Sequence, residues 1–233
     1  SSDVCSSDLG LDRNRDIVLV VFSIFEEELE RQAGGSASEA NLDLLNACVQ
    51  FIHALVPVLP GRVWPLIARS GLLDQEGRSG RLTTILSGIE FVNAKFDFLL
   101  SSVHLFGALV EDLVTHAVLR KGGLKSSAQT GSTDDLGTGV PDHVLSKVTA
   151  SYSKTLLGVF ESACNWRFAI PEQRLLLSKH ISTIFDKLLH YNYGIGEDPS
   201  SGSNLASSLG PAASQVVETF LSPTSPCGKT PKA

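Results

Sequence analysis

The sequence predicts an all-α protein, an irregular α-solenoid of antiparallel helix pairs of the HEAT or ARM kind. Apolar residues recur at steps of three and four along most of the chain, which places them on one stripe of a helix. Short turns rich in glycine, proline or polar residues separate these segments. No segment shows the two-residue alternation, bounded by hairpin turns, that is typical of strands. Helices in series with one apolar stripe each are expected to pack as a solenoid or large bundle.

The first two helices are predicted on either side of Gly34-Gly35. The first covers about residues 14–32, and most of its acidic side chains face away from its apolar stripe. Ser36 and Glu39 have the spacing of a capping box that opens the second helix, which Pro57 and Pro60 are expected to end or kink. The two stripes comprise Val18, Phe22, Phe25 and Leu29, and then Leu42, Leu45, Val49, Ile52, Val56 and Leu59.

A short apolar piece over residues 62–73 and a polar turn over residues 74–80 precede the longest apolar ladder of the chain. The ladder has no slip in its steps of three and four, which predicts one buried stripe. Gly88, Asn93 and Asp97 weaken its middle, so two helices are expected to meet near residues 93–95. Its members are Leu82, Ile85, Ile89, Val92, Phe96, Leu99, Val103, Phe106, Val110, Leu113 and Ala117.

Two further helices are predicted to begin near Pro141 and at Pro171, because proline is favoured in the first turn of a helix. Their stripes comprise Val148, Tyr152, Val159, Ala163 and Trp166, and then Leu177, Ile181, Ile184, Leu188 and Tyr191.

The expected organisation is therefore one solenoid segment interrupted by polar stretches. Stretches of Gly, Ser, Thr and Asp bury too little apolar surface to offset the entropy of ordering, so they are expected to be disordered. Residues 10–121 and 141–193 form the solenoid, residues 122–140 a disordered loop, 194–204 a flexible link, 205–221 a weaker helix and 222–233 a disordered tail.

The first nine residues do not share this pattern. Residues 1–9 resemble one reading frame of a sequencing adapter and are interpreted as a non-native scar. They contain two acids and no base, so without them the formal net charge changes from −6 to −4. This mild acidic balance argues against a nucleic-acid surface, which needs clustered Lys and Arg. The chain contains no Met, which fits an internal piece of a longer protein.

The cysteines and the hydropathy predict a soluble, intracellular protein. Cys48 and Cys164 fall within helical ladders and are expected to fill the core, whereas Cys5 and Cys227 lie near the ends of the chain. Widely spaced cysteines favour a reducing compartment. No segment has the roughly 20 uninterrupted apolar residues of a membrane span.

No catalytic, cofactor or metal site is predicted. The six histidines form neither HExxH nor a close pair with Cys, and zinc needs three or four converging ligands. The acids of the helices are expected on solvated faces, because acid–base catalysis needs a shared cleft. The histidines are His53, His104, His116, His143, His180 and His190, and the acids considered are Glu26, Glu27, Glu28, Glu111 and Asp112.

Three other motifs receive a structural interpretation. Trp64 and Trp166 are candidate partner anchors, but each is in phase with its local apolar pattern, which favours core packing. Gly228-Lys229-Thr230 resembles the end of a phosphate-binding loop, yet Pro223 replaces its first glycine. Three Ser-Pro or Thr-Pro pairs in the tail, Ser222-Pro223, Ser225-Pro226 and Thr230-Pro231, have the form of proline-directed phosphorylation sites, and a disordered tail is the preferred interpretation.

Four runs of residues, taken in order, resemble the fungal nucleoporin 188 family of large scaffold nucleoporins. The resemblance covers about residues 11–221, and the runs are packing and turn motifs rather than catalytic ones. They read VQFIHALVP (49–57), RVWPLIARSGLL (62–73), FDFLLS (96–101) and VFESACNWRF (159–168).

This resemblance implies a non-enzymatic scaffold segment from the N-terminal half of a longer chain, in the inner ring of the nuclear pore complex at the nuclear envelope. It implies a role in nucleocytoplasmic transport of protein and mRNA, and contacts with linker nucleoporins through short helices that lie mostly outside this segment. No partner-binding residue is carried over, and no nucleic acid, membrane insertion or small-molecule substrate is expected. The alternative is a soluble transport receptor or other adaptor solenoid that binds protein cargo; an all-helical enzyme is the third reading.

Overall fold

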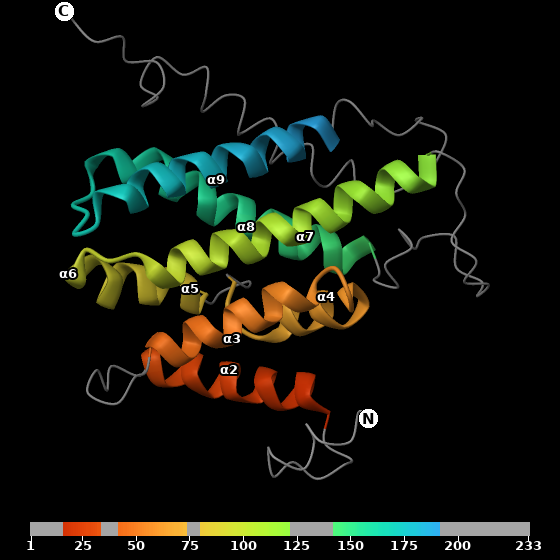
Figure 1. Cartoon of the computed structure of the whole chain (residues 1–233), viewed down its shortest axis with the longest axis horizontal. Coiled ribbons are helices and arrows are strands. Elements are labelled where there is room, and N and C mark those ends of the chain that lie inside the picture. The colour runs from red at the N-terminus through yellow and green to blue at the C-terminus, as the bar shows by residue number, and fades with distance from the viewer. Residues whose placement is uncertain (1–15, 34–41, 74–79, 122–141, 192–233) are drawn as a thin grey trace, which may run out of the picture.

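The computed structural model of the chain describes residues 16–33, 42–73, 80–121 and 142–191, and these residues contain helices but no strand. The labels follow Figure 1. The helices are α2 (Ile17–Ala33), α3 (Leu42–Leu55), α4 (Pro60–Arg69), α5 (Arg81–Ile85), the π-helix η1 (Leu86–Glu90), α6 (Phe91–Asn93), α7 (Asp97–Lys121), α8 (Asp142–Ser162), the 3₁₀-helix η2 (Ala163–Asn165) and α9 (Pro171–Leu189).

The helices are stacked in successive layers. Helix α7 packs mainly against α3 on one side and α9 on the other, and α2 lies beyond α3 (Figure 1). Helix α8 packs against α4, α9 and α7, and α5 packs against α2. The all-α prediction is confirmed, and this arrangement is that of a solenoid.

Helix α2 buries the predicted face. Val18, Phe22, Phe25 and Leu29 are all buried. The helix starts after Asp16, whose carboxylate accepts a hydrogen bond from the Val18 amide at 3.0 Å, as an N-cap residue does. Asp16 also pairs with Arg62 of α4, and this hydrogen bond lowers the pKa of the Asp16 carboxyl.

The two prolines after α3 have different effects. Helix α3 ends at Leu55, before Pro57, as predicted. The prediction for Pro60 is wrong, because Pro60 is the first residue of α4 rather than an interruption of the preceding helix. Proline suits this position, since the first amide of a helix has no intrahelical partner.

The long apolar ladder divides where predicted, but its stripe is not continuous. Ala94 adopts a left-handed conformation (φ 53°) that separates α6 from α7. The prediction of one unbroken stripe is wrong. The π-helix η1 has more residues per turn than an α-helix, so it rotates the apolar positions that follow it away from the stripe. As a result Glu90 is buried beside half-buried Ile89, and Val92 is 84% exposed.

Helix α7 supplies the centre of the core. Its buried residues include Phe98, Leu99, Val103, Phe106 and Leu113, which meet side chains from the flanking helices. Its stretch Asp97–Thr115 is long and apolar enough to cross a membrane by length and composition, and half of it is buried inside the fold. One such helix packed between neighbours is typical of a protein core.

The predicted stripes of α8 and α9 are confirmed. Val148, Tyr152 and Val159 of α8 are buried, as is Ala163 in η2; of the predicted α8 stripe only Trp166 is half-buried. The stripe of α9 is buried over its whole length, and it comprises Leu177, Ile181, Ile184, Leu188 and Tyr191.

Several expectations concern residues that the structure does not describe. These are the scar at 1–9, the capping box of Ser36 and Glu39, the loop at 122–140, the link at 194–204, the weak helix at 205–221 and the tail at 222–233, with its Gly228-Lys229-Thr230 motif and Ser-Pro pairs. They stay predictions.

Candidate functional site

Beside the turn between α6 and α7 lies the most unusual ionisable group of the described residues, Glu90, which is the last residue of η1. The Glu90 side chain is fully buried, and its carboxylate lies at the first turn of α7. Its Oε1 accepts hydrogen bonds from the Phe98 amide at 2.8 Å and the Leu99 amide at 3.3 Å. Glu90 therefore satisfies amides that have no partner within α7.

Burial raises the pKa of Glu90 to about 8, although the two amide hydrogen bonds act in the opposite direction and the Asp97 carboxylate adds to the increase. A buried acid with such a pKa is a candidate for function. Here, however, both oxygens accept from backbone amides, and Asp97 is the one other side chain that acts on the pKa. The geometry supports a capping role.

Gln173 of α9 joins this turn to the turn between α8 and α9. Its Oε1 accepts from the Phe96 amide at 3.0 Å, and its Nε2 donates to Asp97 Oδ1 at 2.7 Å. The Ala169 amide also donates to the Ala94 carbonyl at 2.8 Å. Two turns far apart in the sequence are therefore fixed to each other at one edge of the molecule.

Aromatic rings cover this junction. Trp166 stacks on Phe96 with ring centroids 5.1 Å apart, and it meets Phe91 edge-on at 4.8 Å. Phe168 lies 4.8 Å from Phe96. The prediction of core packing is confirmed for Trp64, which is fully buried, whereas Trp166 is half-buried and partly accessible.

Two histidines meet between α7 and α9. The rings of His104 and His180 are 4.3 Å apart and nearly perpendicular. Burial is the largest cause that lowers the pKa of both histidines. The charges of His180 and then His53 on α3 lower the pKa of His104 further, and the charge of Lys179 lowers the pKa of His180. The described residues contain no group of three His, Cys, Asp or Glu that is placed to hold a metal ion.

The remaining histidines do not extend this pair. His143 and His190 are exposed, and the side chain of His116 lies outside the description. Sequence reasoning missed the pair, because its two members are 76 positions apart on different helices and neither has a distinguishing local pattern.

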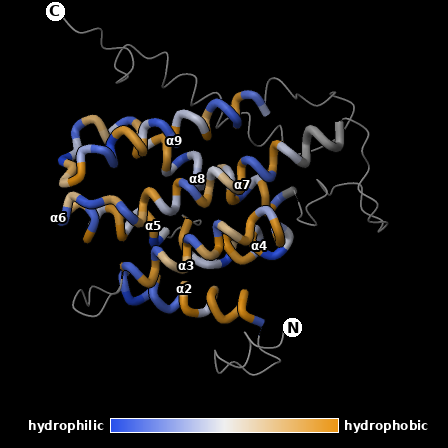
Figure 2. The backbone as a smooth tube through the Cα atoms, viewed as in Figure 1, coloured by the Kyte–Doolittle hydropathy of each residue, from blue (hydrophilic) through white to orange (hydrophobic). Residues whose placement is uncertain are grey.

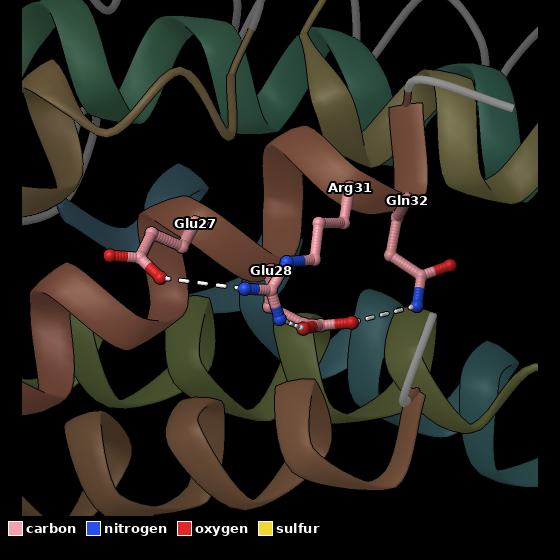
Figure 3. Close-up of polar contacts among 4 residues, drawn as sticks. All are labelled: Glu27, Glu28, Arg31 and Gln32. Atoms are coloured by element: carbon pink, nitrogen blue, oxygen red, sulfur yellow. Dashed lines mark hydrogen bonds and ion pairs between the residues drawn. The ribbon is translucent and has the colours of Figure 1, made fainter. Parts of the chain in front are cut away.

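The acidic run of α2 is only partly solvated. Glu27 pairs with Arg31 at the surface, as expected, but Glu28 is buried, so the prediction of a solvated face is wrong for Glu28. Its carboxylate accepts from Arg31 Nη1 at 3.3 Å and from Gln32 Nε2 at 3.4 Å (Figure 3). Because these partners lie on the next turn of the same helix, Glu28 is held by structural contacts.

The two acids considered on α7 also have structural partners. Glu111 forms an ion pair with Lys187 of α9 at the surface. Asp112 Oδ2 accepts a hydrogen bond from Trp64 Nε1 at 3.0 Å, which satisfies the indole of a fully buried side chain.

The two described cysteines differ. Cys48 is buried as predicted, and burial raises the pKa of its thiol. The prediction for Cys164 is wrong, since it lies in η2 and is exposed. Helix α8 ends at Ser162, so the α-helical spacing that predicted a buried position no longer applies at Cys164.

Four buried hydroxyl groups lie on α7 and α8. Tyr152 stacks on Phe106 at 4.4 Å, and burial raises the pKa of its phenol. The hydroxyls of Tyr152, Ser102, Thr149 and Ser153 have no hydrogen-bond partner among the described residues. All four residues are buried, so these hydroxyls lie within the core.

The comparisons with known proteins agree with this structural character. The family described as nucleoporin Nup188, N-terminal subdomain III, matches residues 6–233. Nucleoporin NUP188 of Chaetomium thermophilum is 30% identical over 214 residues, which are 91% of this chain and 11% of the relative. Nucleoporin NUP188 of Saccharomyces cerevisiae is 22% identical over 207 residues, 89% of this chain and 11% of the relative. The chain thus spans about a tenth of these relatives' length, and it belongs to the Nup188 family of nucleoporins.

Proposed function

We propose that this chain is a scaffold segment of the nuclear pore complex inner ring: one stretch of a long α-solenoid at the nuclear envelope that acts by contacts with other proteins and not by catalysis. Family membership and the helical stack support this function. The structural partners of Glu28, Glu90 and Asp112 within the fold support a role without catalysis. The partners are other nucleoporins, and the contacts with linker nucleoporins lie mostly outside this segment.

The observation that carries the proposal is the first half of α2. Residues 17–25 read IVLVVFSIF, so this half of the helix is apolar on every side except at Ser23 (Figure 2). Ile17, Leu19 and Ile24 are 43%, 48% and 39% exposed. A helix that is apolar all round is normally buried on all sides.

The helices that pack on α2 in this chain leave part of that surface open. Its main contacts are with α3 and α5, and it forms the outermost layer of the stack (Figure 1). A neighbouring helix pair of the same long protein is the natural cover, because repeats of a solenoid stack on one another. We assign it to the segment that precedes α2, since the relatives are about nine times longer than the matched region.

One experiment separates the scaffold from the soluble receptor. The full-length protein is tagged in cells and captured in the presence or absence of a GTP-bound small GTPase. Recovery of pore components regardless of the GTPase supports the scaffold. Recovery of soluble cargo that the GTPase releases overturns it in favour of the transport receptor.

A second experiment tests the face of α2. In the full-length protein, Ile24→Glu is expected to increase hydrogen exchange in the segment before α2, because a buried carboxylate disrupts the contact. Ile24→Leu is the matched control, since it keeps an apolar side chain of the same volume at the same position. Equal exchange in the two variants would show that nothing covers this face.

A further inference from the structure

We propose that the edge formed by the α6–α7 and α8–α9 turns docks a short segment of another protein in which carboxylates flank large apolar side chains. The docking surface, called the turn-edge patch, comprises Phe91, Val92, Trp166, Ile170 and Leu176. This inference rests on the proposed scaffold function, because it adds a partner site to a segment that acts by protein contacts.

The patch is built on the fixed junction of the two turns. Phe91 contacts Trp166 edge-on at 4.8 Å. Ile170 and Leu176 lie three residues before and after Gln173, at the start of α9. Gln173 bonds to the Phe96 amide, and Phe96 contacts both Phe91 and Trp166. These contacts bring Phe91, Trp166 and the start of α9 together.

The patch offers accessible apolar surface. Val92 is 84% exposed, and Phe91, Ile170 and Leu176 are also exposed. Other large exposed hydrophobic side chains of the described residues lie on α2 and α3, at Val58 after α3 and at Leu175 of α9. Contiguous exposed apolar surface rimmed by polar groups is typical of an interaction site.

Positive charge surrounds the patch. Lys95, Arg167 and Arg174 are exposed, and within the described ranges none of them forms an ion pair. The nearby acids Asp97 and Glu172 lie in the first turns of α7 and α9, where the helix dipole offsets their charge. A partner segment with carboxylates complements this rim.

The third nearby acid adds little compensating charge. The side chain of Glu90 is buried against the start of α7, and it is mostly protonated at pH 7 because burial raises its pKa to about 8. The excess of positive charge at this edge contrasts with the formal net charge of −6 of the whole chain.

The stacking of the solenoid does not cover this edge. Successive helices add along the direction from α2 through α3 and α7 to α9, whereas the patch lies where helices end, beside α6 and the α8–α9 turn (Figure 1). A helix pair that stacks on α2 or on the outer side of α9 leaves these turns accessible. A partner from outside the stack is therefore needed to bury them.

The shape favours a protein segment over a lipid surface. Trp166 lies flat on Phe96, and Phe91 packs against both, so the rings are held within the fold rather than projecting from it. Binding to anionic membranes uses clusters of about four to eight basic residues. Three cations around recessed rings match a carboxylate-bearing peptide segment better.

The test uses a photo-cross-linking amino acid, p-benzoylphenylalanine, placed at Val92 in the full-length protein in cells. Cross-linked peptides are sequenced by mass spectrometry. The matched control carries the probe at Leu175, which is 73% exposed and lies two residues from Gln173, hence on the opposite side of α9. The expected result is a cross-link from position 92, and none from position 175, to a segment of a different protein with large apolar residues between carboxylates.

Charge reversal tests the rim. Arg167→Glu is expected to lower the yield of this cross-link by about tenfold, because like charges face each other across the interface. Lys179→Glu is the control, an exposed cation on α9 outside the patch. Arg167 is exposed, so circular dichroism is expected to show an unchanged helical content for both variants.

Four results overturn the proposal: a cross-link to the same chain, to a second copy of the protein, to a lipid, or to nothing. Each of them shows a different occupant or an empty edge. Failure of the scaffold function is a separate result, because it appears as loss of the pore components from the captured protein. Loss of the Val92 cross-link in a protein that still captures pore components overturns the docking site alone.

Discussion

Replacing Glu90 with glutamine is expected to remove the pH dependence that this side chain gives to the stability of the fold. The glutamine oxygen still accepts hydrogen bonds from the amides of Phe98 and Leu99, but it has no proton to lose. Burial raises the pKa of Glu90 from 4.5 to about 8. Between these values the folded chain holds a proton that the unfolded chain has released.

The sign follows from this difference in bound protons. The proton held by Glu90 in the folded chain increases the free energy of unfolding. This increase is fully present below pH 4.5 and is lost as the pH rises toward 8. The loss is about 1.4 kcal/mol per pH unit in the middle of this window. Between pH 6 and pH 8 it amounts to about 2 kcal/mol, since the curve flattens near the folded pKa.

The assay is urea unfolding followed by circular dichroism at pH 6, 7 and 8. The wild-type chain is expected to lose about 2 kcal/mol more than Glu90→Gln over this range. Glu172→Gln is the control, because it removes an exposed carboxylate near the same junction. Parallel pH profiles for wild type and Glu90→Gln would refute the reasoning, since they would mean that the two amides keep Glu90 charged.

Three further outcomes are expected. Ala94→Gly is expected to stabilise the chain by about 1 kcal/mol in urea unfolding, because glycine adopts the left-handed conformation (φ 53°) without the strain of a Cβ atom; a loss of stability would contradict this. A short iodoacetamide pulse, mapped by mass spectrometry, is expected to label exposed Cys164 well before Cys48, whose buried thiol has a raised pKa. Folding lowers the pKa values of His104 and His180, so stability is expected to fall as the pH drops below 6.5, and His104→Gln is expected to reduce that fall in the same unfolding assay.

Much of the fold was predictable because apolar spacing reports directly on which side of a helix is buried. The stripes of α2 and α9 are buried at every predicted position, and the break near Ala94 follows from polar and small residues within an apolar ladder. The family could be inferred from the order of several packing motifs. These are all local patterns, which is why one sequence was enough.

The candidate site was not predictable in the same way. Gln173 and Phe96 are 77 positions apart, and their contact depends on how α9 lies on α7. The burial of Glu90 depends on a π-helix that local composition does not reveal. The π-helix turns Glu90 inward, beside Ile89, which was the residue predicted to be buried. Gly88, within the π-helix, is the local residue that weakens the α-helical pattern there.

The uneven hydropathy of α2 bears on how such a long chain is made. A ribosome releases the earlier part of a protein first, and domains generally fold as they emerge. If the apolar half of α2 packs on the segment that precedes it, that segment has already been synthesised when α2 leaves the exit tunnel of the ribosome. The outer side of α9 carries Glu172, Lys179 and Asp186 around the exposed Leu175, so it depends less on a cover while later segments are still being translated.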